Sequence, residues 1–144
     1  MSQTDTYGFY SNPNERQGRS LPLDSTTGTI EVNDMLTEAT AGYLKKVTAT
    51  SDVVYGVAME RSTAPSADGE KSIRVDISPD SIYRFPPDAG TVTEALKMRM
   101  CDVGADGRSA NIDASSVDCL LIVDVDTVEN VVFVKIRPSY TGVV

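Results

Sequence analysis

The sequence predicts an all-β protein, a small antiparallel barrel or sandwich of about eight short strands with at most one short helix. Short segments rich in Val and Ile alternate with polar residues, which is typical of strands with one buried face. These segments recur roughly every 8–12 residues, and Gly, Pro and Asp turns separate them. The chain has 144 residues, which suits a single domain, and shows no internal repeat.

The first 27 residues differ from the rest of the chain. Met1–Thr27 contains only six apolar residues, and they follow neither a helical nor a strand period. Such a segment buries too little apolar area to offset the entropy of ordering it. We therefore expect an extended N-terminal arm over residues 1–27, disordered alone or ordered by what it touches, and a β-barrel body over residues 28–144.

The first half of the body is expected to hold three strands. Residues 28–33 alternate as a half-buried strand, and residues 33–42 are assigned to a loop. Residues 43–50 and 53–60 are predicted to pair through a short polar turn. Residues 61–70, with a Pro and an Asp-Gly pair, form the clearest loop.

The next segments show the cleanest strand period. In residues 71–78, Ile73, Val75 and Ile77 are expected to face inward, while Arg74 and Asp76 face outward. A short strand over residues 81–85 should end at two prolines, which cannot donate to a ladder.

The second half contains the one candidate helix. Thr91–Glu94 matches a capping box, which predicts at most two helical turns over residues 92–97. A strand is expected at Met98–Met100, and residues 102–113 are predicted to form a long turn region. Two final strands are expected over residues 119–125 and 130–137, followed by an exposed tail.

Composition excludes several classes of partner. The net charge of −8 and the pI near 4.4 argue against nucleic acid and anionic membranes, because both attract clustered Lys and Arg. No apolar run approaches the roughly 18 residues of a membrane helix, and no signal peptide is apparent. We expect a protein made in the cytoplasm.

The sequence does not predict an enzyme. It has no His, which removes the commonest general base and transition-metal ligand. Nucleophile-elbow, Walker A and dinucleotide-binding motifs are absent from the sequence. Asp and Glu are plentiful, but most lie at turns or at outward positions of predicted strands, as solvated charges do. No catalytic residue and no cofactor is predicted.

One loop and two thiols are candidate metal ligands. Asp102, Asp106 and Asp113 occupy the first, fifth and twelfth positions of a calcium-like loop, but Gly104 stands where an oxygen ligand is required. An Asp-Gly turn between strands explains these residues better. Two cysteines without His supply half of a zinc site. Both are expected to be free buried thiols, with a later disulfide left open.

The arm carries the candidate binding residues. Aromatic side chains on a flexible segment can fill pockets on a partner, although they can equally fold back onto their own body. The two Arg can pair with acidic surface, including that of a neighbouring copy, or remain solvated. The predicted attachment residues are Tyr7, Phe9, Tyr10, Arg16, Arg19, Leu21 and Leu23.

Part of the body resembles a known family. In Gly42–Glu60, a polar strand, a Thr/Ser/Asp turn and a strand reading Val54-Tyr-Gly-Val-Ala58 resemble the head decoration, or cement, proteins of tailed bacteriophages. The order of the later segments (72–77, 83–86 and the hairpin 119–136) fits as well, so the resemblance covers roughly residues 28–137.

The resemblance implies a small β-barrel or β-tulip that binds the outside of a capsid and cements the lattice of the major capsid protein. It implies homo-oligomers, with a trimer expected, an N-terminal arm laid across neighbours, and no active site. The expected location is the capsid exterior of the virion.

Two alternatives were kept open. A surface carbohydrate-binding or adhesin-like β module would need an aromatic-rich face, yet three of the nine aromatics lie in the arm. An enzyme that uses carboxylates, with or without a metal, finds its best support in the loop 102–113.

Overall fold

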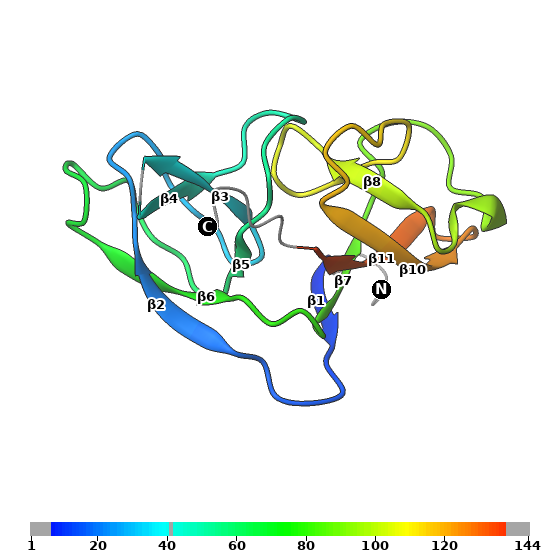
Figure 1. Ribbon diagram of the computed structural model, residues 1–144, viewed down its shortest axis with the longest axis horizontal. Helices are drawn as coiled ribbons and strands as arrows, with labels where there is room; N and C mark the ends of the chain where they lie inside the picture. Colours follow the sequence, from blue (N-terminus) through cyan, green and yellow to red (C-terminus); the bar gives the residue numbers. More distant parts are fainter. Residues whose placement is uncertain (1–6, 41, 138–144) are drawn as a thin grey trace, which may run out of the picture.

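The computed structural model describes residues 7–40 and 42–137 and confirms an all-β protein. Two antiparallel sheets lie side by side and form two lobes (Figure 1). The strands are β1 Gly8–Ser11, β2 Gly18–Pro22, β3 Met35–Thr40, β4 Tyr43–Lys46, β5 Gly56–Ala58, β6 Ser72–Asp76, β7 Ile82–Phe85, β8 Met100–Val103, β9 Ala110–Asn111, β10 Leu120–Asp126 and β11 Val131–Ile136.

Each sheet is open but curls towards closure. The six-stranded sheet has the order β1-β7-β11-β10-β8-β9, and the five-stranded sheet has the order β2-β6-β5-β3-β4. Single bridges join Leu23 to Leu44 in the smaller sheet and Pro87 to Ala110 in the larger one. Within the described ranges neither sheet closes into a barrel, so the expected barrel is replaced by two open sheets.

Several predicted elements are confirmed. The period-2 segment forms β6, the segment ahead of Pro86 forms β7, and the last two strands form the antiparallel pair β10–β11. Residues 61–70 connect β5 to β6 without a strand of their own. These segments have the clearest alternation in the sequence, and their inward residues are buried as the alternation predicts.

The region between residues 28 and 60 was predicted wrongly. Residues 35–40, expected to be a loop, form β3, which lies between β4 and β5, so the predicted direct pairing of 43–50 with 53–60 does not occur. Ile30 makes only a single bridge to Ser62 in place of the expected strand. The sequence MLTEAT has only a weak local preference for a strand, but hydrogen bonding to β4 on one side and β5 on the other makes it one.

The candidate helix is a single 3-10 turn, η2, at Glu94–Leu96. Its N-cap is Thr93, which makes no side-chain cap hydrogen bond, so the predicted capping box from Thr91 is not formed. In the described part of the chain, no helix is long and apolar enough to cross a membrane.

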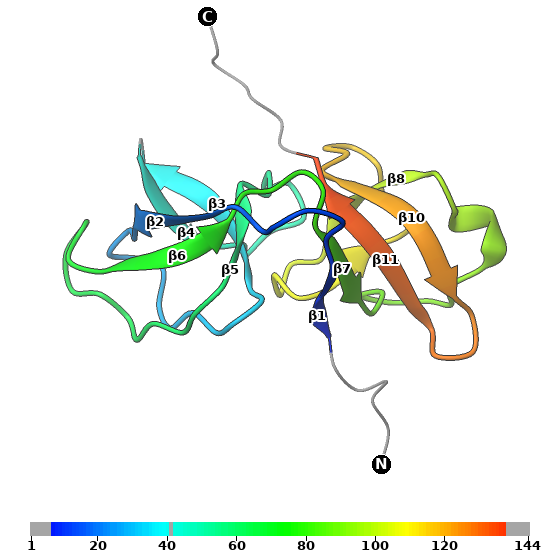
Figure 2. The ribbon, with the colours of Figure 1, turned by 90° about the horizontal axis from the view of Figure 1, so that it is seen from below.

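The N-terminal segment is extended as predicted, but it does not form an arm separate from the body. β1 pairs with β7 in the larger sheet, and β2 pairs with β6 over five residue pairs in the smaller one. Residues 8–11 and 18–22 are ordered by what they touch, the second of the two expected outcomes. Edge-strand pairing supplies hydrogen-bond partners to a backbone that its few apolar side chains could not order. Figure 2 shows the segment between β1 and β2 crossing from one sheet to the other.

Two apolar cores fill the lobes. The larger core includes Tyr83 and Phe85, and the smaller includes Leu36 and Ile73. Successive residues of β3 and β5 divide between them: Met35 and Val57 join the larger core, while Leu36 and Ala58 join the smaller. Because side chains alternate across a strand, these two strands tie the lobes together.

Candidate attachment surface

The structure separates the predicted attachment residues into exposed and buried groups. Tyr7 and Tyr10 are 43% and 59% exposed on and beside β1. Phe9 points the opposite way from Tyr10 and packs edge-to-face on Tyr83, with ring centroids 5.9 Å apart. The three aromatics therefore do not act as one cluster, since a strand sends neighbouring side chains to opposite faces.

The remaining apolar candidates belong to the smaller lobe. Leu23 is fully buried in its core, and Leu21 packs against the same core while half-buried. Arg19 is exposed on β2. The structure thus excludes Leu23 from direct contact with a partner and leaves Arg19 on the surface.

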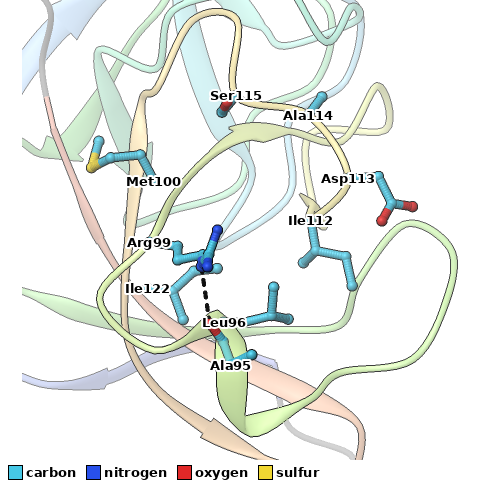
Figure 3. A pocket seen from close by; sticks show the side chains of 9 residues that line it. All are labelled: Ala95, Leu96, Arg99, Met100, Ile112, Asp113, Ala114, Ser115 and Ile122. Atoms are coloured by element: carbon cyan, nitrogen blue, oxygen red, sulfur yellow. Dashed lines mark hydrogen bonds between the residues drawn. The ribbon is translucent and has the colours of Figure 1, made fainter.

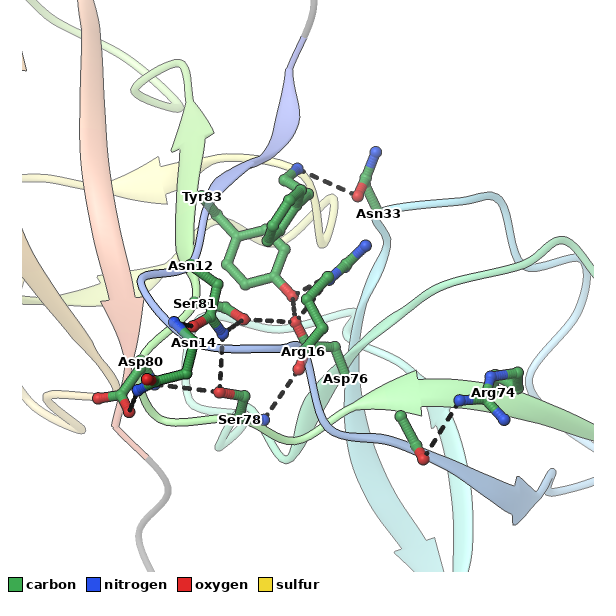
Figure 4. Close-up of polar contacts among 12 residues, drawn as sticks. Asn12, Asn14, Arg16, Asn33, Arg74, Asp76, Ser78, Asp80, Ser81 and Tyr83 are labelled. Carbon is green, nitrogen blue, oxygen red and sulfur yellow. Dashed lines mark hydrogen bonds and ion pairs between the residues drawn. The ribbon is translucent and has the colours of Figure 1, made fainter.

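Arg16 is the centre of a polar junction between the two sheets (Figure 4). Its Nε donates to Asp76 Oδ2 at 2.9 Å, and its Nη2 donates to the Tyr83 hydroxyl at 3.2 Å. The guanidinium also lies 3.9 Å from the centroid of the Phe9 ring, a cation–π contact. Arg16 is engaged within its own chain instead of being free for acidic surface elsewhere.

Asp76 accepts most of the hydrogen bonds in this junction. Its Oδ2 accepts from Ser81 Oγ at 2.7 Å and from the Tyr83 hydroxyl, and its Oδ1 accepts from the Ser78 amide at 2.9 Å. Burial acts to raise the pKa of Asp76, but these bonds and Arg16 outweigh it, so the pKa lies below its ordinary value. Burial and the Asp76 contact raise the pKa of Tyr83, which stays neutral.

Further hydrogen bonds fasten the segment between β1 and β2. Asn12 Nδ2 donates to Ser78 Oγ at 3.0 Å and to Ser81 Oγ at 2.9 Å, and Ile77 donates its amide to the Gln17 carbonyl at 3.1 Å. The two connections between the sheets, residues 12–17 and 77–81, are therefore bound to each other.

Asn33 closes the outer edge of β1. Its Oδ1 accepts from the Phe9 amide at 3.2 Å, and its Nδ2 donates to the Tyr7 carbonyl at 3.5 Å. Asn33 adopts a positive φ of 75°, a conformation that Asn tolerates better than most residues. The edge that carries Tyr7 is thus held by the smaller lobe.

Two pockets open on the surface of the larger lobe and beside β1. Figure 3 shows one of about 270 Å³ between η2 and the loop after β9, where Leu96, Ile112 and Ile122 line it with Arg99 and Asp113. Arg99 Nε donates to the Ala95 carbonyl at 3.0 Å and so fixes the 3-10 turn. The other, of about 190 Å³, lies beside Tyr7 and Phe85.

The calcium-like loop does not assemble as a site. Asp102 is buried on β8 and accepts the amides of Ser116, Val117 and Asp118, while Asp106 accepts from Arg108 and Ser109 in the following turn. Among the described residues, no group of three or more His, Cys, Asp or Glu could hold a metal ion.

The two cysteines are free and buried, as predicted. Burial raises the pKa of Cys101 to about 12 and that of Cys119 to about 11, so both remain unreactive thiols in the folded protein.

The main acceptor of the junction, Asp76, was expected to face outward and is 2% exposed. It does point away from the smaller core, in which Ile73 and Val75 are buried, but the larger lobe covers it through Ser81 and Tyr83. Hydroxyls at Ser78, Ser81 and Tyr83, just downstream, are the one sequence signal for a buried carboxylate here. The chain matches no protein-family model, no curated protein and no solved structure.

Proposed function

We propose that this chain is a virion structural protein that binds the outer surface of a phage capsid and cements the lattice of the major capsid protein. The observation that carries the proposal is the pair Tyr7 and Tyr10, which are exposed beside and on β1, an edge strand that pairs with β7 and is held by Asn33. Large aromatic side chains supply much of the binding energy at protein interfaces. This role does not involve catalysis on a substrate.

The fastened strand changes how attachment would work. Arg16, Asp76 and Asn33 hold the N-terminal segment in place before any partner arrives. A preorganised surface avoids the ordering cost that a disordered arm would meet on binding. Attachment therefore uses a rigid face of the protein in place of the folding-on-binding arm that the sequence suggested.

The choice of a capsid as partner rests on the sequence resemblance around residues 42–60, 72–77 and 119–136. A repeating lattice also suits a protein that offers only a few anchors, because many weak contacts become collectively tight. A trimer on that lattice remains a prediction from the same resemblance.

Co-sedimentation with capsids tests the proposal. The probe is expanded capsids purified without decoration protein from the phage that carries this gene. We expect the full-length protein to pellet with them, and the double variant Tyr7→Ser, Tyr10→Ser to bind at least about tenfold more weakly. Tyr55→Ser is the matched control, because Tyr55 is also 43% exposed but lies just before β5 of the other sheet.

A negative result in the co-sedimentation test has a defined interpretation. If the unchanged protein does not pellet with the capsids, attachment to capsids is wrong. Glycan-array binding that is lost in the double variant would then favour the carbohydrate-binding alternative. Truncation to residues 28–144 is unsuitable as a test, because it removes β1 and β2 from the two sheets.

A further inference from the structure

The solvent-facing side of the six-stranded sheet, which we call the outer face, is mostly apolar. The inward residues of β7, β11 and β10 enter the larger core, so the alternate residues point outward. Most of these outward residues are half-buried, Arg84 is buried, and Tyr10 and Asp124 are more exposed. The outer face consists of Tyr10, Ile82, Leu121, Val123, Phe133 and Lys135, with Arg84 and Asp124 on either side of Phe133.

Strand register makes these residues neighbours. Lys135 lies opposite Ile82 on β7 and opposite Leu121 on β10, so the three form one row across the sheet. The Tyr10 ring packs edge-to-face on Phe133, with centroids 4.7 Å apart. Figure 2 shows β1, β7, β11 and β10 side by side in this order. The exposed aromatic of the N-terminal strand thus belongs to a larger continuous surface.

Lys135 stands in the middle of this surface. It has no ion-pair partner among the described residues, and apolar side chains flank it on both neighbouring strands. The carboxylate of Asp124, which lies opposite Phe133, is already 3.7 Å from Lys97 Nζ. A partner that covers the outer face must therefore provide a carboxylate opposite Lys135, because a charge buried without a partner is costly.

We propose that the outer face is the docking surface for the capsid, and that it seats on an apolar patch with a carboxylate opposite Lys135. This inference rests on the proposed function and adds the chemistry of the partner. The carboxylate that a second copy docked face to face would bring, that of Asp124, is already 3.7 Å from Lys97 Nζ of its own chain. The geometry thus favours a different protein surface over self-pairing through this face.

Charge reversal with a matched control tests the inference. Lys135→Glu and Lys45→Glu change the charge equally, and both lysines are half-buried on strands without an ion-pair partner in the described part of the chain. Binding to the expanded capsids named above is measured by co-sedimentation. We expect Lys135→Glu to weaken binding about 30-fold or more and Lys45→Glu to change it less than about twofold.

Two further variants separate the effect of charge from the effect of folding. Lys135→Arg keeps the charge and should retain binding. Lys135→Met keeps the apolar stem without the charge, so it should fold even if Lys135→Glu does not, and it should still lose binding. Equal binding by Lys135→Glu, Lys135→Met and the unchanged protein would overturn the docking face while leaving capsid attachment intact. Failure of the unchanged protein to bind capsids would overturn the function itself. Concentration-dependent self-association that Lys135→Glu abolishes would overturn the assignment to a different protein.

Discussion

The two sides of β1 carry out different tasks, although the sequence presents their aromatic residues as one cluster. Phe9 points inward, stacks under Arg16 and joins the polar junction around Asp76. Tyr10 points outward onto Phe133. The comparison teaches that the inner side holds the N-terminal segment, whereas the outer side leaves Tyr10 exposed for the proposed binding role. Inner substitutions should therefore cost stability, and outer substitutions should cost binding.

The largest expected effect comes from the centre of the inner side. Asp76→Ala should lower the free energy of unfolding by about 3–5 kcal/mol, because it leaves Arg16 and the Tyr83 hydroxyl without their buried partner. Urea unfolding measures the change. Asp80→Ala is the control, with less than about 1 kcal/mol expected, since Asp80 accepts only a 3.4 Å bond from Asn14 at the surface. Similar losses for both variants would mean that the junction does not hold the segment.

Acid should weaken the same junction. The pKa of Asp76 is lower in the folded protein than its ordinary value near 3.8, so its contribution is full above that value and is lost as the pH falls towards the folded pKa. We expect a fall in stability below about pH 4 that is shallower in Asp76→Asn. Unfolding by urea across a pH series provides the measurement. An equal slope in both proteins would assign acid sensitivity to other carboxylates, such as Asp24, whose pKa is also lowered.

A smaller effect is expected at the edge of β1. Asn33→Ala removes the hydrogen bonds to Phe9 and Tyr7 and places Ala at a φ of 75°, so we expect a loss of about 1–2 kcal/mol. Asn33→Gly removes the same bonds but relieves the backbone strain. Thermal unfolding measures the stability of both variants, and the difference between them gives the free-energy cost of the backbone strain at position 33. If neither variant lowers stability, the side chain of Asn33 does not hold the edge.

The smallest effect on stability is expected on the outer side. Tyr10→Ser should lower the free energy of unfolding by less than about 1 kcal/mol, because the ring is 59% exposed and packs mainly on Phe133. Phe9→Ser, its neighbour on the inner side, should cost more in the same assay. A reversed order would contradict the division of β1 into a holding side and a binding side.

The sequence predicted the strands whose alternation of apolar and polar residues matches their burial in the fold. β6, β7 and the β10–β11 hairpin alternate clearly and were found in place. β3 was missed because its ladder partners, not its composition, make it a strand. The N-terminal strands were missed for the same reason, since their order depends on β6 and β7.

The sequence did not show which of the predicted attachment residues are accessible. Tyr7 and Tyr10 are exposed, whereas Leu23 is buried and Phe9 and Arg16 make contacts within the chain. The outer face could not be read from sequence, because Ile82, Lys135 and Leu121 become neighbours only through strand register. A one-residue shift in that register would send each side chain to the opposite face.

Lysine acetylation of the free and capsid-bound protein tests the outer face most directly. Acetic anhydride modifies exposed amines, and mass spectrometry reports the extent at Lys135 and Lys45 in the same sample. The account predicts that capsid binding protects Lys135 and leaves Lys45 as reactive as in the free protein. Protection of Lys45 together with unchanged modification of Lys135 would contradict it.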